Sequence, residues 1–363
     1  MPVSKLTKRF PNLKEWERGA AQPTLKQLEQ FAKAVHVPIG FLFLPAPPVE
    51  KAPIPDFRSG GERLRQPSPE LLDTVYICQQ RQEWYRDHAI ATGEEPLPFV
   101  GSASTSNAIE PVAATIRHAL HLDIEERSQI SSWSEALRRM VEQADAAGVL
   151  VMRNGVVLNN NNRPLEPGEF RGFTLSDTVA PLIFVNAADS KAAQMFTLAH
   201  ELAHVWLGQT ALGDEEAGRL PEDATERWCD QVAAEILVPL SAIREIYRRG
   251  AELNAEANRL ARYFKVSSLV ALRRVFDAGA VSRQGFQQAY DHELENLARI
   301  AKESAGGGDF YLTQGARVGK RFARALIEST AEGRTLYREA LHLLGFTKLS
   351  TLHDLGRSLE VPV

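Results

Sequence analysis

Two histidines and a glutamate form an H-E-x-x-H pattern at residues 200–204, a spacing that can bind and use a metal ion. On a helix, His200 and His204 lie one turn apart and about 40° apart around the axis, close enough to hold one ion. Glu201 lies between them, where its carboxylate can deprotonate a metal-bound water. The pattern therefore predicts metal-dependent hydrolysis, with the two histidines as metal ligands and Glu201 as the general base.

The residues around this motif favour a metal site over a packing role. Ala203, Val205, Trp206 and Leu207 make the segment strongly apolar. Two histidines and a glutamate buried among such residues cost free energy unless each polar group has a partner. A metal ion supplies that partner, whereas packing alone would favour apolar residues at these positions.

A catalytic zinc needs three protein ligands and an open fourth position, so a third ligand must come from another element. Glu226 is the best candidate, because it lies 22 residues after His204 on the next predicted helix. Asp230 follows one turn later and can accept the distal N–H of a ligand histidine, which fixes the tautomer of that histidine. We therefore predict His200, His204 and Glu226 as ligands and Asp230 as a supporting carboxylate.

Four other side chains stay open as ligands. Glu235 is the second choice for the third position, and Asp214 and Glu215 are alternatives from an acidic loop. Cys229 is less favoured, because it is the only cysteine near the motif, although thiolates are common zinc ligands.

The predicted reaction is the hydrolysis of an amide. Glu201 takes a proton from the metal-bound water, which attacks the polarised carbonyl, and then passes the proton to the leaving nitrogen. The metal stabilises the oxyanion, and a side-chain donor such as Tyr247 or His292 can assist. The sequence does not select between those two donors.

Short β-type runs precede the motif and have to support it. Residues 148–152, 172–175 and 181–185 are each typical of one strand, so a small sheet is expected before the motif helix. That helix starts near Ser190, whose side chain can cap it, and ends at Gly208. A second helix, over residues 224–237, carries Glu226, and the proline that follows stops it.

Helices are expected on both flanks of this core. Before the sheet, the apolar spacing predicts helices over residues 70–91, 107–122 and 130–147. After residue 237 helices continue to about residue 300, and the glycines at 306–308 mark a hinge. Residues 309–363 are expected to form a small helical appendage, to which no chemistry is assigned.

Four basic residues in this appendage fall on one helical face. Arg317, Lys320, Arg321 and Arg324 are spaced i, i+3, i+4 and i+7. A solvated face is the preferred interpretation, and an acidic partner or nucleic acid is the alternative.

The N-terminal residues 1–44 are predicted to be helical. Residues 13–19 form a short helix ended by glycine, and Thr24 with Gln27 has the pattern of a capping box for the next helix. A first helix has no room before Lys5. Residues 45–69 are rich in proline and are expected to be an extended linker, of which residues 54–58 pack onto the following domain.

The bulk composition is that of an ordinary water-soluble globular protein. The chain has 363 residues, of which 44% are hydrophobic and 24% charged, and its net charge is −4. That charge gives no general affinity for nucleic acid. Two cysteines form no disulfide framework, and no apolar run of 18 residues occurs, so a cytoplasmic protein is expected.

Two resemblances add to this interpretation. Residues 180–186, 196–204 and 226–235 resemble the ImmA/IrrE family of bacterial and phage metallopeptidases. Residues 16–32 resemble the second half of a phage-repressor-type (XRE-like) helix-turn-helix domain, although a helix is missing. A vestigial docking module is therefore preferred to DNA binding for this part of the chain.

The family resemblance implies a fold, a metal and a substrate class. It implies an α+β, mostly helical fold with a zincin-like core of the gluzincin type, in which His200, His204 and Glu226 hold Zn²⁺. Ligand chemistry also allows Mn²⁺. The implied substrates are DNA-binding repressors, whose cleavage switches on a stress, mobile-element or prophage response.

The sequence therefore predicts four parts and one main function. The parts are a partial helix-turn-helix-like module (1–44), a proline-rich linker (45–69), a zincin-like peptidase domain with helical flanks (70–305) and a small C-terminal helical appendage (309–363). The main hypothesis is a zinc endopeptidase that cleaves a repressor-type regulator. The alternative is a DNA-binding or antitoxin-like transcriptional regulator whose metal site is structural or sensory.

Overall fold

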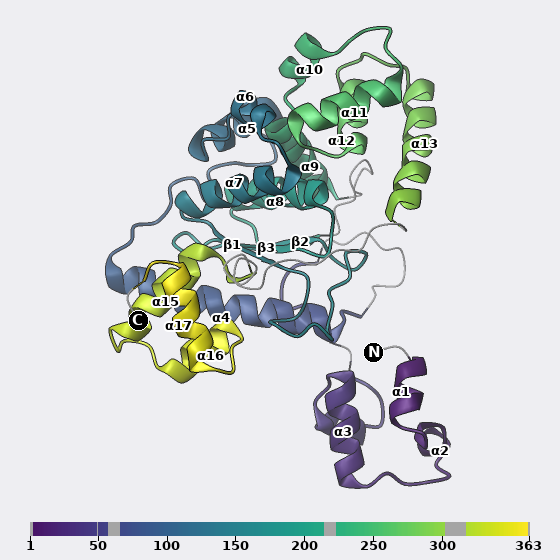
Figure 1. Ribbon diagram of the computed structural model, residues 1–363, viewed down its shortest axis with the longest axis vertical. Helices are drawn as coiled ribbons and strands as arrows, with labels where there is room; N and C mark the ends of the chain where they lie inside the picture. The colour runs from purple at the N-terminus through teal and green to yellow at the C-terminus, as the bar shows by residue number, and fades with distance from the viewer. Residues whose placement is uncertain (1–2, 49, 57–65, 214–222, 302–316, 362–363) are drawn as a thin grey trace.

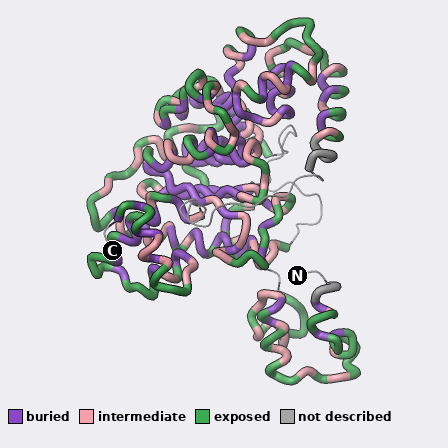
Figure 2. Tube along the Cα trace, viewed as in Figure 1, coloured by how far each residue is buried: buried purple, intermediate pink, exposed green. Residues whose placement is uncertain are grey.

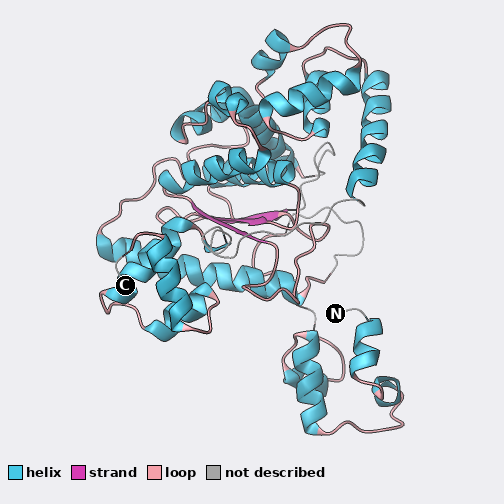
Figure 3. Cartoon of the chain, viewed as in Figure 1, coloured by secondary structure: helices cyan, strands magenta, loops and turns pink. Residues whose placement is uncertain are grey.

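A computed structural model describes residues 3–48, 50–56, 66–213, 223–301 and 317–361 (Figure 1). Helices predominate in these ranges, and a four-stranded sheet lies between helical layers (Figure 3). The strands are β1 (Leu150–Asn154), β2 (Gly172–Leu175), β3 (Leu182–Asn186) and β4 (Ala211–Gly213). The expected α+β, mostly helical fold is confirmed.

The sheet has the order β1-β3-β2-β4. Strands β1 and β3 are parallel, whereas β2 is antiparallel to both of its neighbours. Both faces of the sheet are covered, which explains why the strands are almost continuously apolar. Strand β4 was not predicted from the sequence. It is only three residues long and forms through its pairing with β2, a long-range contact without a local signal.

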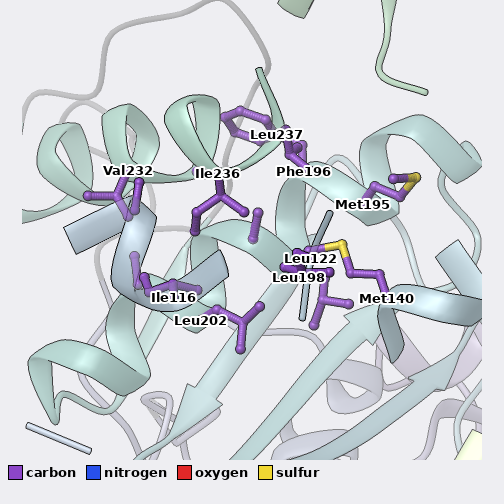
Figure 4. Close-up of a cluster of buried hydrophobic side chains, with 14 of the residues drawn as sticks. Ile116, Leu122, Met140, Met195, Phe196, Leu198, Leu202, Val232, Ile236 and Leu237 are labelled. Carbon is purple, nitrogen blue, oxygen red and sulfur yellow. The ribbon is translucent and has the colours of Figure 1, made fainter. Parts of the chain in front are cut away.

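One face of the sheet carries the motif helix and the helices around it. Figure 4 shows a part of their shared core, where Leu198 and Leu202 of the motif helix pack near Ile116, Met140 and Ile236. The helices of this layer are α5 (Ile109–Ala119), α6 (Ile124–Gln129), α7 (Trp133–Ala146), α8 (Lys191–Leu207) and α9 (Ala224–Leu237). Further helices pack beyond them: α10 (Leu240–Ile246), α11 (Leu253–Phe264), α12 (Ser268–Asp277) and α13 (Arg283–Ala301).

The opposite face of the sheet packs against α4 and the C-terminal helices. They share one hydrophobic core, to which Phe173 and Phe184 of the sheet and Phe322 and Leu343 of the C-terminal region contribute. The helices are α4 (Pro69–Thr92), α15 (Lys320–Ala331), α16 (Tyr337–Leu344) and α17 (Leu349–Ser358). The C-terminal helices are therefore part of the body of the protein, and Figure 2 shows their buried inner side.

The basic stripe of the C-terminal region contacts the chain itself. Its guanidinium and ammonium groups donate to internal acceptors: Arg317 to Asn159 Oδ1 (2.9 Å), Lys320 to Glu142 Oε1 (2.7 Å), Arg321 to Glu94 Oε2 (2.7 Å) and Arg324 to the Leu359 carbonyl (3.1 Å). These contacts attach α15 to α7 and α4 and to the end of α17. Lys320 and Arg324 are exposed, as a solvated face requires, and the stripe also makes contacts within the chain.

The N-terminal residues form a small helical unit. It contains α1 (Val3–Arg9), α2 (Leu13–Glu17), α3 (Leu25–Val35) and a 3-10 turn, η1 (Ile39–Phe43). Its apolar contacts centre on Leu6, Phe10, Leu13 and Ala34. A first helix was expected to have no room before Lys5, but α1 begins at Val3 and runs to Arg9, and Leu6 and Phe10 attach it to this core. The capping box is present, since Thr24 accepts from the Gln27 N–H and Gln27 accepts from the Thr24 N–H.

The linker makes one strand-like contact with the body. The Leu212 N–H of β4 donates to the Pro55 carbonyl at 3.0 Å, and Asp56 forms a parallel bridge with Leu212. Ile54 is buried in the core beneath the sheet. The rest of the stretch expected to pack, residues 57 and 58, lies outside the described residues.

None of the described helices combines the length and apolarity that a membrane-crossing helix requires.

Candidate metal centre

Helix α8 places the motif inside the protein. The Ser190 hydroxyl caps its first turn by accepting from the Ala193 N–H, and Gly208 ends it with a left-handed φ of 67°. Every residue from 194 to 206 is buried, because the sheet lies on one side of this helix and other helices cover the rest. The polar groups of the motif are therefore withdrawn from water, where each needs a partner.

The two histidines face each other. The Nε2 atoms of His200 and His204 are 3.1 Å apart, as expected for side chains one helical turn apart that point to the same place. Both rings are almost fully buried, with 0% and 1% exposure. Two buried nitrogens at this distance point to a shared proton or a shared cation.

Helix α9 brings the third predicted ligand to the same point. Glu226 Oε2 is 3.1 Å from His200 Nε2, and Glu226 Oε1 is 3.3 Å from His204 Nε2. The position of Glu226 follows from the start of the helix, where Asp223 accepts from the N–H groups of Thr225 and Glu226. Glu226 thus lies in the first turn, and its side chain reaches α8.

Asp230 lies one turn further along α9, behind His200. Its Oδ1 accepts a hydrogen bond from His200 Nδ1 at 2.9 Å, if Nδ1 carries the proton. That tautomer leaves the Nε2 lone pair of His200 directed at His204 and Glu226. The structure therefore brings together the side chains of His200, His204, Glu226 and Asp230. Glu201 follows His200 on the same helix, and its carboxylate contacts strand β2.

The protonation of these groups suits metal binding. Burial is the largest influence on His204 and lowers its pKa, so the ring is neutral and keeps a lone pair. Burial opposes the ionisation of Glu226, but hydrogen bonds and charge from His200 and His204 outweigh it and lower its pKa. A neutral imidazole and an ionised carboxylate are the forms that bind divalent cations.

The spacing of the three ligand atoms fits a tetrahedral ion. Bonds of about 2.1 Å place the ligand atoms of a tetrahedral zinc about 3.4 Å apart. The distances between the two Nε2 atoms and the Glu226 oxygens are 3.1 to 3.3 Å. His204 Nδ1 is buried and has no hydrogen-bond partner among the described residues, so the polar contacts of this ring with His200 and Glu226 are made through Nε2.

Cys229 also approaches this centre. Its Sγ lies within 4.8 Å of the ring nitrogens that His200 and His204 offer. Burial raises the pKa of the Cys229 thiol well above its ordinary value, so the thiol is protonated. The Glu226 carboxylate lies 3.1 and 3.3 Å from the two histidines, and its lowered pKa keeps it ionised, so we prefer Glu226 as the third ligand.

Strand β2 supplies the surroundings of Glu201. Thr174 Oγ1 donates to Glu201 Oε2 at 2.6 Å, and both side chains are almost fully buried. Gly172 faces the same carboxylate, because a Cβ added there would lie 2.9 Å from Glu201 Oε1. The sequence did not identify Thr174 or Gly172. Strand alternation could have placed them on one face, but not opposite Glu201.

The alternative ligands and donors lie elsewhere. Glu235 is buried at the far end of α9, where it pairs with Arg274 of α12, so it is not a ligand at this centre. His292 hydrogen-bonds with Asn254 in the outer helices, and Tyr247 packs against the core after α10. Asp214 and Glu215 lie outside the described residues.

A family comparison covers the whole of this centre. The model of a protein family described as the IrrE N-terminal-like domain, Peptidase_M78, matches residues 144–276. The match supports the ImmA/IrrE resemblance for this part of the chain and, with it, a metal-dependent peptidase. A second family model, a domain of unknown function (DUF8813), matches residues 318–358, which include the three C-terminal helices. No curated protein matches the chain.

Proposed function

We propose that this protein is a zinc-dependent endopeptidase that hydrolyses a peptide bond in a repressor-type transcription regulator. The observation that carries the proposal is the buried triangle of His200, His204 and Glu226, whose ligand atoms lie at the spacing of a tetrahedral metal site. Three protein ligands leave one position for water or substrate, as a catalytic zinc requires. The peptidase match over residues 144–276 supports the same class of reaction.

In the proposed hydrolysis, Glu201 and Asp230 have different roles. A bound divalent metal would supply Lewis acidity for the attacking water and the peptide carbonyl. Glu201 accepts the proton of the attacking water and delivers it to the leaving nitrogen. Asp230 holds the His200 ring in one orientation and tautomer. The low exposure of these side chains keeps bulk water away and strengthens each electrostatic contact.

The choice of a regulator as substrate rests on the ImmA/IrrE resemblance. A cytoplasmic stress or prophage response is the setting that the resemblance implies. Zinc is preferred because two imidazoles and one carboxylate form a usual zinc ligand set, and manganese is the alternative.

The test combines metal analysis with cleavage. The purified protein is expected to carry about one zinc per chain by elemental analysis, and to cleave a repressor encoded beside its gene. Glu201→Gln should retain the metal and lose cleavage. Equal cleavage by this variant would refute the proposed role of Glu201, and a metal-free wild type that binds no added zinc would refute the site.

A second candidate function, DNA binding, is favoured by charge. Residues 1–44 contain seven Lys or Arg residues and three Asp or Glu residues, which gives this segment a net charge of +4 in a chain of net charge −4. A local positive charge is what binding to phosphates requires. Retardation of a promoter fragment from its own gene, weakening steeply with salt, would support this function. Identical retardation by a chain that starts at residue 50 would exclude the N-terminal segment as the cause.

A further inference from the structure

Strand β2 and helix α8 meet where Glu201 lies. Alternate residues of a strand share a face, so Gly172 and Thr174 both point to α8, whereas Phe173 and Leu175 enter the core on the other side. On the helix, Thr197 and Glu201 are one turn apart and point to β2. The alternation of the strand and the turn of the helix together place Gly172 beside Thr197 and Thr174 beside Glu201.

The contact between Thr174 and Glu201 is short and dry. Thr174 Oγ1 is 2.6 Å from Glu201 Oε2 and 3.1 Å from the Glu201 carbonyl. The hydroxyl has one proton, and the carboxylate oxygen at the shorter distance is the better acceptor for it. Thr174 has 0% exposure and Glu201 1%, so water does not compete for either group.

Gly172 leaves the space that this arrangement needs. A Cβ at this position would lie 2.5 Å from Thr197 Cγ2 and 2.9 Å from Glu201 Oε1. A side chain at residue 172 would therefore push the carboxylate away from its present place. Strand β2 therefore accommodates both carboxylate oxygens of Glu201: Thr174 donates a hydrogen bond to Oε2, and Gly172 leaves space for Oε1.

We propose that Thr174 is a positioning residue, whose hydroxyl fixes the Glu201 carboxylate in the orientation that base catalysis needs. A glutamate side chain has several rotamers, and holding one of them before the reaction removes an entropic cost from the catalytic step. The inference rests on the proposed peptidase function, because Glu201 is the base only in that function. Thr174 itself touches neither metal ligand nor substrate in this role.

The first test measures the contact without metal or substrate. Thr174→Val keeps the shape of the side chain and removes the donor. Both measurements use metal-free protein. With Glu201 present, we expect Thr174→Val to raise the unfolding equilibrium constant about 10-fold more than it does in a Glu201→Ala background. The reason is that only the protein with Glu201 loses a buried hydrogen bond to a carboxylate. Equal effects in the two backgrounds would overturn the proposal.

The second test measures catalysis, with the repressor that the wild type cleaves as substrate. Thr174→Val should lower kcat about 10- to 100-fold with KM and zinc content nearly unchanged, as removal of a supporting residue does. Thr174→Ser keeps the donor and should stay within about 3-fold of the wild-type kcat. Wild-type kcat for Thr174→Val, or an equal loss for Thr174→Ser, contradicts the inference.

A matched control separates this role from general damage. Thr330 is also buried, and its hydroxyl donates to the Leu326 carbonyl within α15, far from the motif in the sequence. Thr330→Val should leave kcat at the wild-type value. If the wild type cleaves no repressor, the proposed function fails, and the unfolding comparison still decides whether Thr174 holds Glu201.

Discussion

At the scale of single residues, the candidate metal centre offers two side chains for the third ligand position, Glu226 and Cys229. Both Glu226 and Cys229 come within reach of His200 and His204, but the pKa of Glu226 is lowered, which keeps it ionised, whereas the pKa of the Cys229 thiol is raised. Asp230 contacts the Nδ1 of His200, and its proposed contribution to the site is indirect. The two predictions that follow separate these contributions.

The third ligand can be identified by substitution on α9. Glu226→Gln should weaken zinc binding about 100-fold or more, because a neutral amide replaces a charged ligand. Cys229→Ala should leave about one zinc per chain and nearly the same affinity. Competition with a chelator of known affinity measures both variants, and the opposite pattern would assign the site to the thiol.

Asp230 should affect metal affinity without being a ligand. Asp230→Ala removes the acceptor 2.9 Å from His200 Nδ1, and we expect zinc to bind about 10-fold more weakly. Asp291→Ala, which removes an exposed carboxylate from α13, is the control for lost negative charge. An unchanged affinity for Asp230→Ala, measured by the same competition, would remove Asp230 from the site.

At the scale of elements, one buried carboxylate joins two helices from distant parts of the chain. Asp145 lies in the last turn of α7, and its Oδ2 accepts from the Arg321 N–H in the first turn of α15 at 3.0 Å. Burial, which outweighs this hydrogen bond, raises the pKa of Asp145 to about 6. The contact therefore has a free energy that depends on pH.

The sign of that dependence follows from the raised pKa. Between about pH 4 and 6 the folded protein retains a proton that the unfolded chain has lost, so the free energy of unfolding falls as pH rises. The expected loss is about 3 kcal/mol, complete above about pH 7. Asp145→Asn keeps an acceptor but does not titrate. The difference between the wild type and this variant in urea unfolding from pH 4 to 8 should show the fall, and a constant difference would contradict it.

The sequence predicted helices α8 and α9 and the residues of the centre because their signals are local. Ser190, Gly208 and Asp223 cap these helices, and the spacing of the two histidines places both rings on one face of α8. The pairing of Glu235 with Arg274 depends on residues far apart in the chain, so no local pattern announces it. The same reason explains why strand β4 and the support from Thr174 were missed.

At the scale of the whole molecule, the C-terminal helices and the N-terminal unit differ in how they are attached. The C-terminal helices share a core with α4 and one face of the sheet. The N-terminal unit has a small core of its own, centred on Phe10. The hinge expected at 306–308 lies outside the described residues, but the helices after it cannot be treated as an independent addition.

Truncation should expose this difference. Each buried residue such as Phe322, Leu326 or Leu343 contributes about 2 kcal/mol, and several of them together are comparable to the whole stability of a domain. A chain that ends at residue 301 is therefore expected to aggregate or to lose cooperative unfolding. A chain that starts at residue 50 should keep a cooperative transition, with Tm within about 5 °C of the wild type. Scanning calorimetry and gel filtration of both chains measure the outcome, and a soluble, cooperatively folded chain ending at residue 301 would contradict it.

The contact between the linker and β4 also affects the tendency of the protein to aggregate at high concentration. An exposed strand edge is a template on which a second molecule can extend the sheet. Here the Leu212 N–H already donates to the Pro55 carbonyl. Pro53 and Pro55 have no backbone N–H, so neither can donate a hydrogen bond to a further strand. Molecules that collide along this side find no complete row of donors and acceptors. The linker therefore covers part of the β4 edge, along which a second molecule could otherwise extend the sheet.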